Sequence, residues 1–545
     1  MREEVDSLKA EIDALKAQQE QQGAAQAQTQ AQLQQLQSQL ADANTRADRA
    51  EAQVQAQIET IPGEVQTEAA KYKPKTDKIY YKGITVTLGG FAAAESVYRT
   101  RNDVADIGSN YSKIPYDNSV LAHEGEARLT ARQSRLSLLA QGAIDPSTIA
   151  SFYGEFDFLA DAQTGNSNES NSYSPRIRNL YGAVDWNDAG WHLLAGQNWS
   201  LATMNGKGIT PRNEVIPPTI EAQYVPGFVW ARQPQIRITK DFADKQVWLA
   251  VSAENPQTTI ASAASGTGTA YSGVTPNYNN PGISLLNSVN SFSLNSVPDV
   301  VGKIAVEPII GGAQPLHAEV FGLLKQAYDR VNIAPAATNQ AGMVGLGAGN
   351  VTDTAWGGGV GGGVTLAAAP KLLDLQVSGI VGQGIGRYGS GQLPDAIVGP
   401  DGGLELLHEY MIMAGATLHA TPDLDLYAFG GTEDESALYQ NPTIGGKVAP
   451  LGYGDPLATL GNCFVELGAC SPDTHQIDQY TVGLWDKLYT GPFGQLRVGL
   501  QFSHTDLHAF PGLAGTNTAG FLPGSIVRPT TDDNMLFTSF RYYPF

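Results

Sequence analysis

Short turns alternate with long polar loops along residues 79–545, and this alternation limits the possible folds more than any other feature of the sequence. The seven short turns carry Pro, Gly, Asn or Asp and lie near 145–146, 187–190, 241–244, 311–312, 370–371, 422–423 and 491–492. The eight long polar stretches lie at about 100–125, 162–175, 200–226, 255–299, 328–352, 388–405, 433–474 and 506–532. These connections imply sixteen strands. An even strand number with short connections on one side and long ones on the other is typical of a bacterial transmembrane β-barrel.

The segments between these connections alternate apolar and polar residues with a period of two. In residues 148–160 the apolar face carries Ala150, Phe152, Phe156 and Phe158, and the polar face carries Ser151, Tyr153, Glu155 and Asp157. The same period appears in 373–381 and 496–503. One apolar and one polar face per strand suits a sheet that closes between lipid and water, and sixteen strands leave a water-filled lumen. A soluble β-sandwich or propeller is the rival fold, but eight such long loops would be unusual in one soluble domain.

The composition excludes two other classes of protein. Charged residues make up 16% of the 545 residues and the formal net charge is −20, so the sequence lacks the basic surplus of a nucleic-acid-binding protein. No stretch approaches the roughly 18 consecutive apolar residues of a membrane-spanning helix. We therefore expect neither a nucleic-acid partner nor a helical membrane domain.

The first 61 residues follow a different period and are predicted to form an α-helical coiled coil. Apolar residues recur at intervals of three and four in 5–15 and again in 33–54, whereas glutamines occupy the seam between them. Pro62-Gly63 ends the pattern, and residues 62–78 are predicted to be a linker. A disordered low-complexity spacer remains the alternative for residues 1–61. The predicted fold is all-β and transmembrane, with a 16-stranded antiparallel β-barrel at 79–545 behind an N-terminal α-helical coiled coil.

The chemistry-bearing residues point to neither a metal site nor an enzyme. The two cysteines, Cys463 and Cys470, lie seven residues apart in a loop, and a small loop-closing disulfide is the favoured interpretation. A metal site would need further ligands nearby, so we expect no metal and no cofactor. A Ser-His hydrolase would need a paired nucleophile and base, which strand facing does not establish. We expect no catalytic residues.

Several features of the sequence resemble a known group of proteins. The chain ends FTSFRYYPF over 537–545, which is similar to the carboxy-terminal assembly sequence of outer-membrane barrels, although Arg541 stands where an apolar residue is usual. The segments SRLSL at 134–138 and RNLYG at 178–182 look like the second and fourth strands of sixteen-stranded trimeric porins, and GQNW at 196–199 looks like the end of the fifth. An N-terminal coiled coil joined to such a barrel is similar to the DcaP-like porins. The resemblance implies a homotrimer in the bacterial outer membrane, surrounded by lipid and lipopolysaccharide, with its coiled coil in the periplasm.

Strand parity directs several arginines towards the predicted lumen. Arg128 and Arg132 alternate with apolar residues, Arg135 precedes a second such alternation, and Arg237 lies between two isoleucines. The resemblance adds Arg178, which with Arg135 matches wall arginines at the constriction. A ladder of this kind would hold carboxylates by paired hydrogen bonds, because the guanidinium group is planar and permanently charged. The alternative is that these are ordinary solvated side chains near the rims.

Four acidic residues complete the predicted site. Glu155 and Asp157 share the polar strand face and could neutralise nearby arginines. The resemblance implies that the loop at 200–226 folds inward. Its ionisable residues include Lys207, Arg212, Glu214 and Glu221. If its two acids face the wall arginines, they would set a transverse field across the narrowest point.

These expectations lead to two hypotheses about function. The first is an outer-membrane porin, a passive water-filled channel for small hydrophilic solutes, with anionic carboxylates or dicarboxylates as the expected preference. The second is a structural protein whose coiled coil tethers the outer membrane to the cell wall by binding peptidoglycan. A helical rod of some 55 residues would reach roughly 80 Å, which fits both hypotheses.

Overall fold

The structure is a computed structural model that divides into two compact units, Met1–Thr76 and Asp77–Phe545. It describes residues 78–163, 173–261, 274–277, 293–333, 349–399, 401–441, 443–444, 447–448, 451–515 and 520–545, together with the helical residues Gln39, Thr45, Arg46 and Arg49. The predicted coiled coil at 1–61 and the linker at 62–78 therefore lie almost entirely outside the described residues. Within the described residues, no helix has the length and apolarity to cross a bilayer.

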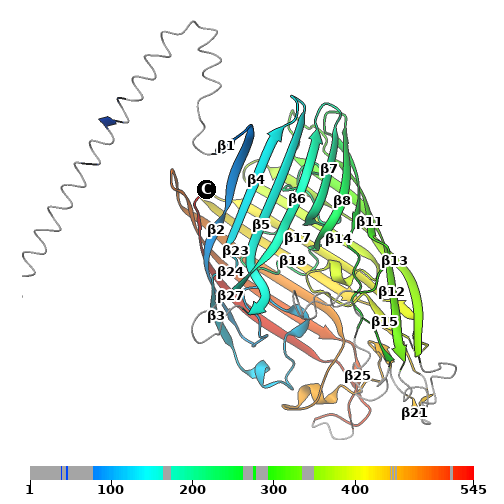
Figure 1. Cartoon of the computed structure of the whole chain (residues 1–545). Helices are drawn as coiled ribbons and strands as arrows, with labels where there is room; N and C mark the ends of the chain where they lie inside the picture. Colours follow the sequence, from blue (N-terminus) through cyan, green and yellow to red (C-terminus); the bar gives the residue numbers. More distant parts are fainter. Residues whose placement is uncertain are drawn as a thin grey trace, which may run out of the picture. The chain divides into compact units, whose positions relative to one another are not determined.

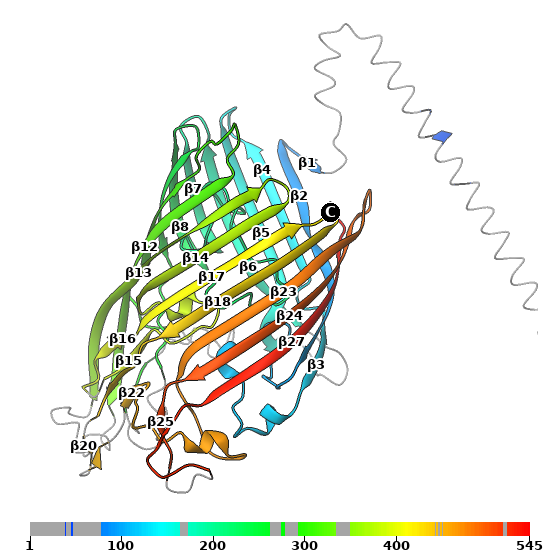
Figure 2. The same cartoon turned by 180° about the vertical axis from the view of Figure 1, so that it is seen from behind.

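Sixteen antiparallel strands close the second unit into a barrel among the described residues (Figures 1 and 2). The strands follow one another around the wall in chain order: β2 (Ile84–Arg99), β3 (Glu126–Thr130) with β4 (Arg135–Ala143), β5 (Thr148–Gln163), β6 (Tyr173–Trp186), β7 (Trp191–Trp199), β8 (Arg232–Phe242), β9 (Val247–Glu254), β11 (Asp299–Val306), β12 (Leu316–Ile333), β13 (Gly349–Ala369), β14 (Leu373–Gln383), β17 (His408–His419), β18 (Leu424–Glu435), β23 (Thr474–Gly491), β24 (Gly494–Ala509) and β27 (Thr530–Tyr543). Strands β3 and β4 both pair with β2 and count as one. The barrel closes where β27 pairs with β2, from Ala92 opposite Tyr542 to Arg99 opposite Met535.

The predicted alternation of connection lengths is confirmed. All seven predicted short turns join neighbouring strands at one end of the barrel, and the long loops lie at the other end (Figure 1). The turn between β8 and β9 is the most unusual, because Ala243, Asp244 and Lys245 have φ values of 50°, 53° and 65°. Residues with a Cβ rarely adopt this left-handed region. Minor strands, among them β1 (Ile79–Tyr81) and β10 (Val274–Thr275), extend the sheet or cross-link the long loops.

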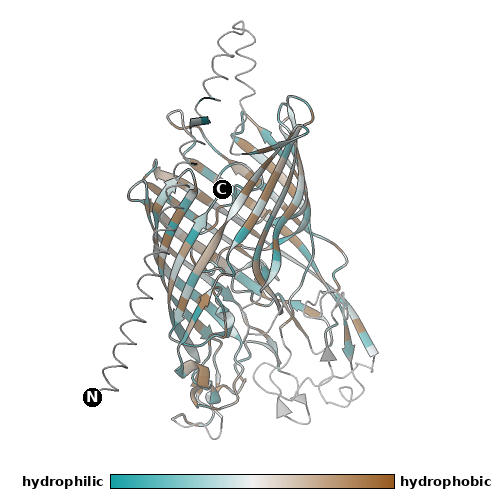
Figure 3. Cartoon of the chain, turned by 60° about the vertical axis from the view of Figure 1, so that its left-hand side comes forward, coloured by the Kyte–Doolittle hydropathy of each residue, from teal (hydrophilic) through white to brown (hydrophobic). Residues whose placement is uncertain are grey.

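The two faces of the wall differ as the period of two predicts. On β8, β9 and β12 the apolar residues Ile236, Val251 and Val320 are exposed on the outer face, whereas the polar residues Arg237 and Ser252 are buried inside. The alternation of hydrophilic and hydrophobic residues along the strands is visible in Figure 3. A lone barrel exposes its apolar face because lipid covers that face in a membrane.

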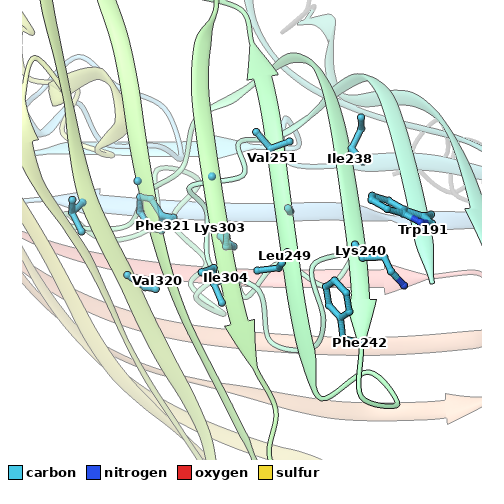
Figure 4. A pocket seen from close by; sticks show the side chains of 14 residues that line it. Trp191, Ile238, Lys240, Phe242, Leu249, Val251, Lys303, Ile304, Val320 and Phe321 are labelled. Atoms are coloured by element: carbon cyan, nitrogen blue, oxygen red, sulfur yellow. The ribbon is translucent and has the colours of Figure 1, made fainter. Parts of the chain in front are cut away.

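An apolar groove of about 680 Å³ runs along the outer face between β8 and β13 (Figure 4). Aliphatic side chains such as Ile238 and Leu249 line it, and Gly302 and Gly322 leave its floor open. At the short-turn end, the ammonium group of Lys240 lies 4.8 Å from the ring centroid of Phe242. Lys240 therefore belongs to the outer surface and takes no part in the lumen.

The glycine-rich stretch of β13 makes room for side chains inside the barrel. A Cβ at Gly361 would collide with the ring of Phe321, and a Cβ at Gly363 would lie 2.7 Å from the sulfur of Met204. Met204 belongs to the segment between β7 and β8, so the absence of side chains on this face of β13 allows that segment to pack directly against the wall. In the long connection between β18 and β23, Cys463 and Cys470 form a disulfide.

Candidate functional site

The connection between β7 and β8, residues 200–231, folds into the barrel and forms the inner boundary of the candidate site. Its apolar side chains are buried against the wall, among them Leu201, Ile209 and Phe228. They join two clusters that also contain wall residues such as Val301 and Phe537. We call residues 200–231 the inward loop.

Four wall glutamates hold the inward loop by its backbone. The amide groups that donate to them, in the order of the loop, are Leu201 to Glu254 at 2.8 Å, Asn205 to Glu319 at 3.1 Å, Gly208 to Glu307 at 2.5 Å and Gly227 to Glu433 at 2.8 Å. All four glutamate side chains are buried. Hydrogen bonds from amides to ionised carboxylates are roughly twice as strong as neutral ones, so these glutamates fix the position of the loop.

A cavity of about 340 Å³ lies between the inward loop and the wall, with lining residues from β4, β5, β6, β17, β18, β23, β24 and β27. Four arginines, Arg135, Arg178, Arg497 and Arg541, line it from the wall. The loop contributes Ile216, two prolines, Thr219, Glu221, Ala222 and Tyr224. Asp157, Asp425 and His419 also line the cavity from the wall, so the four arginines share it with three carboxylates.

One of these arginines, Arg178, forms a tight network together with Arg176, its neighbour on the same face of β6. Arg178 donates to Glu155 at 2.6 Å, to Asp157 at 3.0 Å and to the hydroxyl of Tyr224 at 3.1 Å. Arg176 forms two further bonds to Asp157, at 2.9 and 2.8 Å. This network holds the guanidinium groups in fixed positions on β6.

Arg541 on β27 is fixed in the same way. It donates to Glu95 at 2.9 Å and to Gln133 at 2.9 Å, and its guanidinium group stacks on Trp485 and Phe91. Its neighbours Phe540 and Tyr542 point outward. Arg541, which stands where an apolar residue is usual in the last strand, therefore points into the lumen.

Three other arginines keep donor groups that no neighbour uses. Within the described part of the chain, no carboxylate forms an ion pair with Arg497 or Arg232, which stack on Tyr543 and Trp199. Arg135 reaches Glu155 only at 3.7 Å, and its Nε has no hydrogen-bond partner there. The Nη1 of Arg232 also lacks a partner among the described residues. Both of these nitrogens are buried, and the Nε of Arg497 donates to Gln495, so the groups left to an anion are the Nη groups of Arg135 and Arg497.

The positive charge of this arginine cluster lowers the pKa of Tyr224. Burial alone would raise the pKa of its hydroxyl, but the charges of Arg178, Arg232 and Arg135 outweigh burial and lower the pKa to about 8. A phenol ordinarily has a pKa near 10. The arginine charges are therefore only partly neutralised by the carboxylates around them.

The other arginines predicted from strand parity lie away from the cavity. Arg128 pairs with Glu126 at 3.2 Å and Arg132 with Asp106 at 3.0 Å, both towards the long-loop end. Arg237 is buried and donates to Gln235 at 3.0 Å and to the carbonyl of Trp199 at 2.6 Å. The structure thus brings Arg135, Arg178, Glu155 and Asp157 together and places the remaining three elsewhere.

The two acids predicted in the inward loop face neutral partners. Glu214 accepts from the amide of Asn198 at 3.0 Å, and Glu221 accepts from the backbone of Ser109 at 3.1 Å and from Gln479 at 3.2 Å. Burial raises the pKa of both carboxyl groups. Among the described residues neither forms an ion pair with a wall arginine, so the transverse field stays a prediction.

The prediction from sequence missed Arg176, Arg232, Arg497, Arg541 and Tyr224. Strand parity could have found Arg497 and Arg541, because each lies between residues that point outward. Tyr224 lies in the inward loop, where no period applies, and Arg232, the first residue of β8, shares the parity of the outward-facing Ile236 and Ile238. The described residues contain no group of three or more His, Cys, Asp or Glu side chains placed to hold a metal ion.

Solved structures share this architecture, whereas no protein-family model and no curated protein matches the sequence. The outer membrane channel DcaP of Acinetobacter baumannii has a TM-score of 0.55 at 17% identity, over 85% of this chain and 99% of that one. OmpF of Salmonella typhi in complex with daunomycin has a TM-score of 0.43 at 11% identity, over 86% and 99%. The anion-selective porin from Comamonas acidovorans has a TM-score of 0.41 at 10% identity, over 84% and 99%. The latter two values are too low to support a conclusion. The first likeness shows the fold, and this chain has the porin-like fold of an outer-membrane channel.

Proposed function

We propose that this chain is a passive outer-membrane channel for small hydrophilic solutes and that it prefers anions, carboxylates above all. The observation that carries the preference is the cavity between the inward loop and the wall, where four arginines outnumber the three lining carboxylates, Asp157, Glu221 and Asp425. A low-dielectric surface opposite fixed cations strengthens their attraction for a solute anion.

The pattern of pairing supports carboxylates in particular. Glu155 and Asp157 pair with Arg178, and Glu95 pairs with Arg541. Both guanidinium groups contribute positive charge to the cavity, but the N–H groups used in these ion pairs are not available to a solute. Arg497 and Arg135 line the same cavity, and among the described residues Arg497 donates only from its Nε, to Gln495, while Arg135 approaches Glu155 only at 3.7 Å. A guanidinium group with free N–H groups binds a carboxylate through two parallel hydrogen bonds.

The test is the reversal potential of single channels under a potassium chloride gradient. We expect the wild-type chain to prefer chloride over potassium. The double variant Arg135→Ala with Arg497→Ala should lose most of that preference, because it removes the two arginines with free donors and leaves Arg178 and Arg541 with their partners.

Lys240→Ala is the matched control, because it also removes a positive charge but on the outer face. It should leave the reversal potential unchanged. A wild-type preference for potassium, or a preference for chloride that survives the double variant, would refute the proposed anion selectivity.

We further propose that the chain forms a homotrimer in the bacterial outer membrane, in contact with lipid and lipopolysaccharide, with the short turns and residues 1–61 on the periplasmic side. Three coiled-coil segments held together by one trimer would have a high effective concentration, which supports helix pairing. Native mass spectrometry of the detergent-solubilised chain, with and without residues 1–61, tests this part. A monomer in both samples would contradict it.

A further inference from the structure

His317, the second residue of β12, has a carboxylate at each nitrogen of its ring. Its Nδ1 lies 2.8 Å from Glu307, which follows β11, and its Nε2 lies 3.0 Å from Glu319, two residues further along β12. No more than 3% of any of these three side chains is exposed. A carboxylate accepts hydrogen bonds and donates none, so both ring nitrogens donate and the imidazole is in its cationic form.

The second proton of this ring also balances the charge around it. Glu319 accepts from the ammonium group of Lys303 on β11 at 2.6 Å, and this lysine is fully buried as well. Two carboxylates and two cations thus form a neutral group in the interior. Without the second ring proton the group would hold one uncompensated negative charge, which is costly to bury.

The ionisable groups that face this network come from four elements of the structure. Glu307 and Lys303 come from β11 and its end, and Glu319 comes from β12. Arg237 of β8 and Glu214 of the inward loop lie beyond the lysine and act on its charge. The two glutamates act directly on the ring, so they are the first groups to respond when it loses its proton.

The same two glutamates are anchors of the inward loop. Glu319 accepts from the amide of Asn205 with Oε2, which is also the oxygen that faces His317. Glu307 likewise uses one oxygen, Oε1, for the ring and for the amide of Gly208. One imidazole therefore orients both of the oxygens that hold the backbone of the loop here.

Lys303 holds the same part of the loop through its oxygen atoms. Its ammonium group donates to the carbonyl of Thr203 at 2.8 Å and to the side-chain oxygen of Asn205 at 3.3 Å. The network thus binds residues 203–208 by their donors and by their acceptors. A change of charge within it acts on this segment before any other part of the inward loop.

We infer that His317 is a positioning residue of the channel, whose cationic ring holds residues 203–208 against the wall and releases them when it loses a proton. The attachment is present at low pH and is lost as the pH rises. A neutral imidazole has one N–H group and one lone pair, and the lone pair would face a carboxylate. As a control of permeation this inference rests on the proposed channel function, whereas the attachment of the segment does not.

The experiment follows the amides of residues 203–208 by hydrogen–deuterium exchange and mass spectrometry, with the full chain in detergent. Rates measured between about pH 6 and about pH 9 are divided by the intrinsic exchange rate at each pH, so that only structural protection remains. In the wild-type chain we expect protection to fall about tenfold or more as the pH rises, because a charge-assisted hydrogen bond is lost. Constant protection over this range would overturn the inference.

Two substitutions should abolish this pH dependence for different reasons. His317→Gln cannot take up a proton, and its segment should be as poorly protected at low pH as the wild-type segment is at high pH. Glu307→Gln removes one negative charge, so a neutral imidazole already balances the network and the second ring proton is no longer required. It also keeps the experiment decisive if His317→Gln does not fold. A wild-type pH profile in either variant would contradict the role of the ring.

His192 offers a matched control, because its ring also lies between two carboxylates, 2.7 Å from Asp185 and 3.0 Å from Asp241. Within the part of the chain that the structure describes, neither aspartate accepts from an amide of the inward loop. His192→Gln should therefore leave the pH profile of residues 203–208 unchanged. Loss of the profile in this control would show a general response of the barrel and would overturn the assignment to His317.

Single-channel recordings connect the attachment with permeation. They are made in a Tyr224→Phe background, because the phenol of Tyr224 ionises near pH 8. We expect conductance to rise reversibly at high pH, and Glu307→Gln should show no such rise. Constant conductance with changing protection would overturn the role of His317 in the channel.

The outcome is distinct from that of the proposed selectivity. Protection that depends on pH through His317 supports the attachment even if the reversal potential shows no anion preference. A chloride-selective channel with constant protection of residues 203–208 supports the channel function and contradicts the role of His317.

Discussion

The two sides of the lumen carry charge for different purposes. From β9 to β18, buried glutamates accept hydrogen bonds from the backbone of the inward loop, so their negative charge is used within the fold. From β24 through β27 to β6, arginines line a cavity, and two of them keep unused donors. The glutamates stabilise the position of the inward loop because their carboxylates accept hydrogen bonds from its backbone amides. The arginines that keep free N–H groups remain available to bind a solute.

The largest effect should come from removing a loop anchor. Glu433 accepts from the amides of Gly227 and Gly391 and from the hydroxyl of Ser390. Glu433→Ala leaves these buried donors unpaired, and we expect it to lower the free energy of unfolding by about 3–5 kcal/mol and to increase single-channel conductance as the loop detaches. Urea unfolding followed by tryptophan fluorescence, together with bilayer recordings, checks both. Glu433→Gln keeps one acceptor oxygen and should show a smaller loss.

Arg178→Ala should affect both stability and selectivity. It leaves Glu155 and Asp157 with weaker partners in a buried site, and we expect the free energy of unfolding to fall by about 3 kcal/mol. Chloride preference should also decline because the net charge of the cluster falls by one. The same unfolding and reversal-potential measurements apply. If the variant is as stable as the wild type, the ion-pair network on β6 contributes no more to the free energy of unfolding than a surface ion pair does.

Arg497→Ala should separate selectivity from stability. Arg497 has no ion pair among the described residues, so its removal should change the free energy of unfolding by less than about 0.5 kcal/mol. Chloride preference should nevertheless decrease measurably in the reversal potential. A large loss of stability without a change in selectivity would reverse the contrast between the two sides of the lumen.

The smallest effect should be a dependence of selectivity on pH. The pKa of Tyr224 is lowered to about 8, so its hydroxyl loses a proton as the pH rises through 8 and adds a negative charge beside Arg178. Chloride preference should therefore fall between pH 7 and pH 9 in the wild-type chain. Tyr224→Phe cannot ionise, and its reversal potential should stay constant over this range. Equal pH dependence in both proteins would assign the effect to another group.

The strand number, the turns and the facing of most strand residues could be predicted from the sequence, because each depends on local periods and on Pro, Gly, Asn and Asp at turns. The direction in which Arg541 points could be predicted from the alternation along β27. This arginine departs from the usual apolar residue of a closing strand, yet its position between Phe540 and Tyr542 places it in the lumen, where it pairs with Glu95.

The pairing of charges could not be predicted in the same way. Glu214 and Glu221 lie in a loop that has no period, and their partners Asn198 and Gln479 come from distant parts of the chain. The four anchoring glutamates looked like any other lumen residues, because their role appears only when the backbone of the inward loop lies beside them. Tyr224 is distinctive only once three arginines surround it.

The glycine stretch of β13 ties the seating of the inward loop to a wall position behind it. Met204 lies where Gly363 has no side chain, and a Cβ there would lie 2.7 Å from its sulfur and 2.5 Å from the carbonyl oxygen of Val377. A methyl group at this position would therefore strain the pairing of β13 with β14 and press on the loop at once. The loop and the sheet behind it thus constrain each other at a position that can change only together with both.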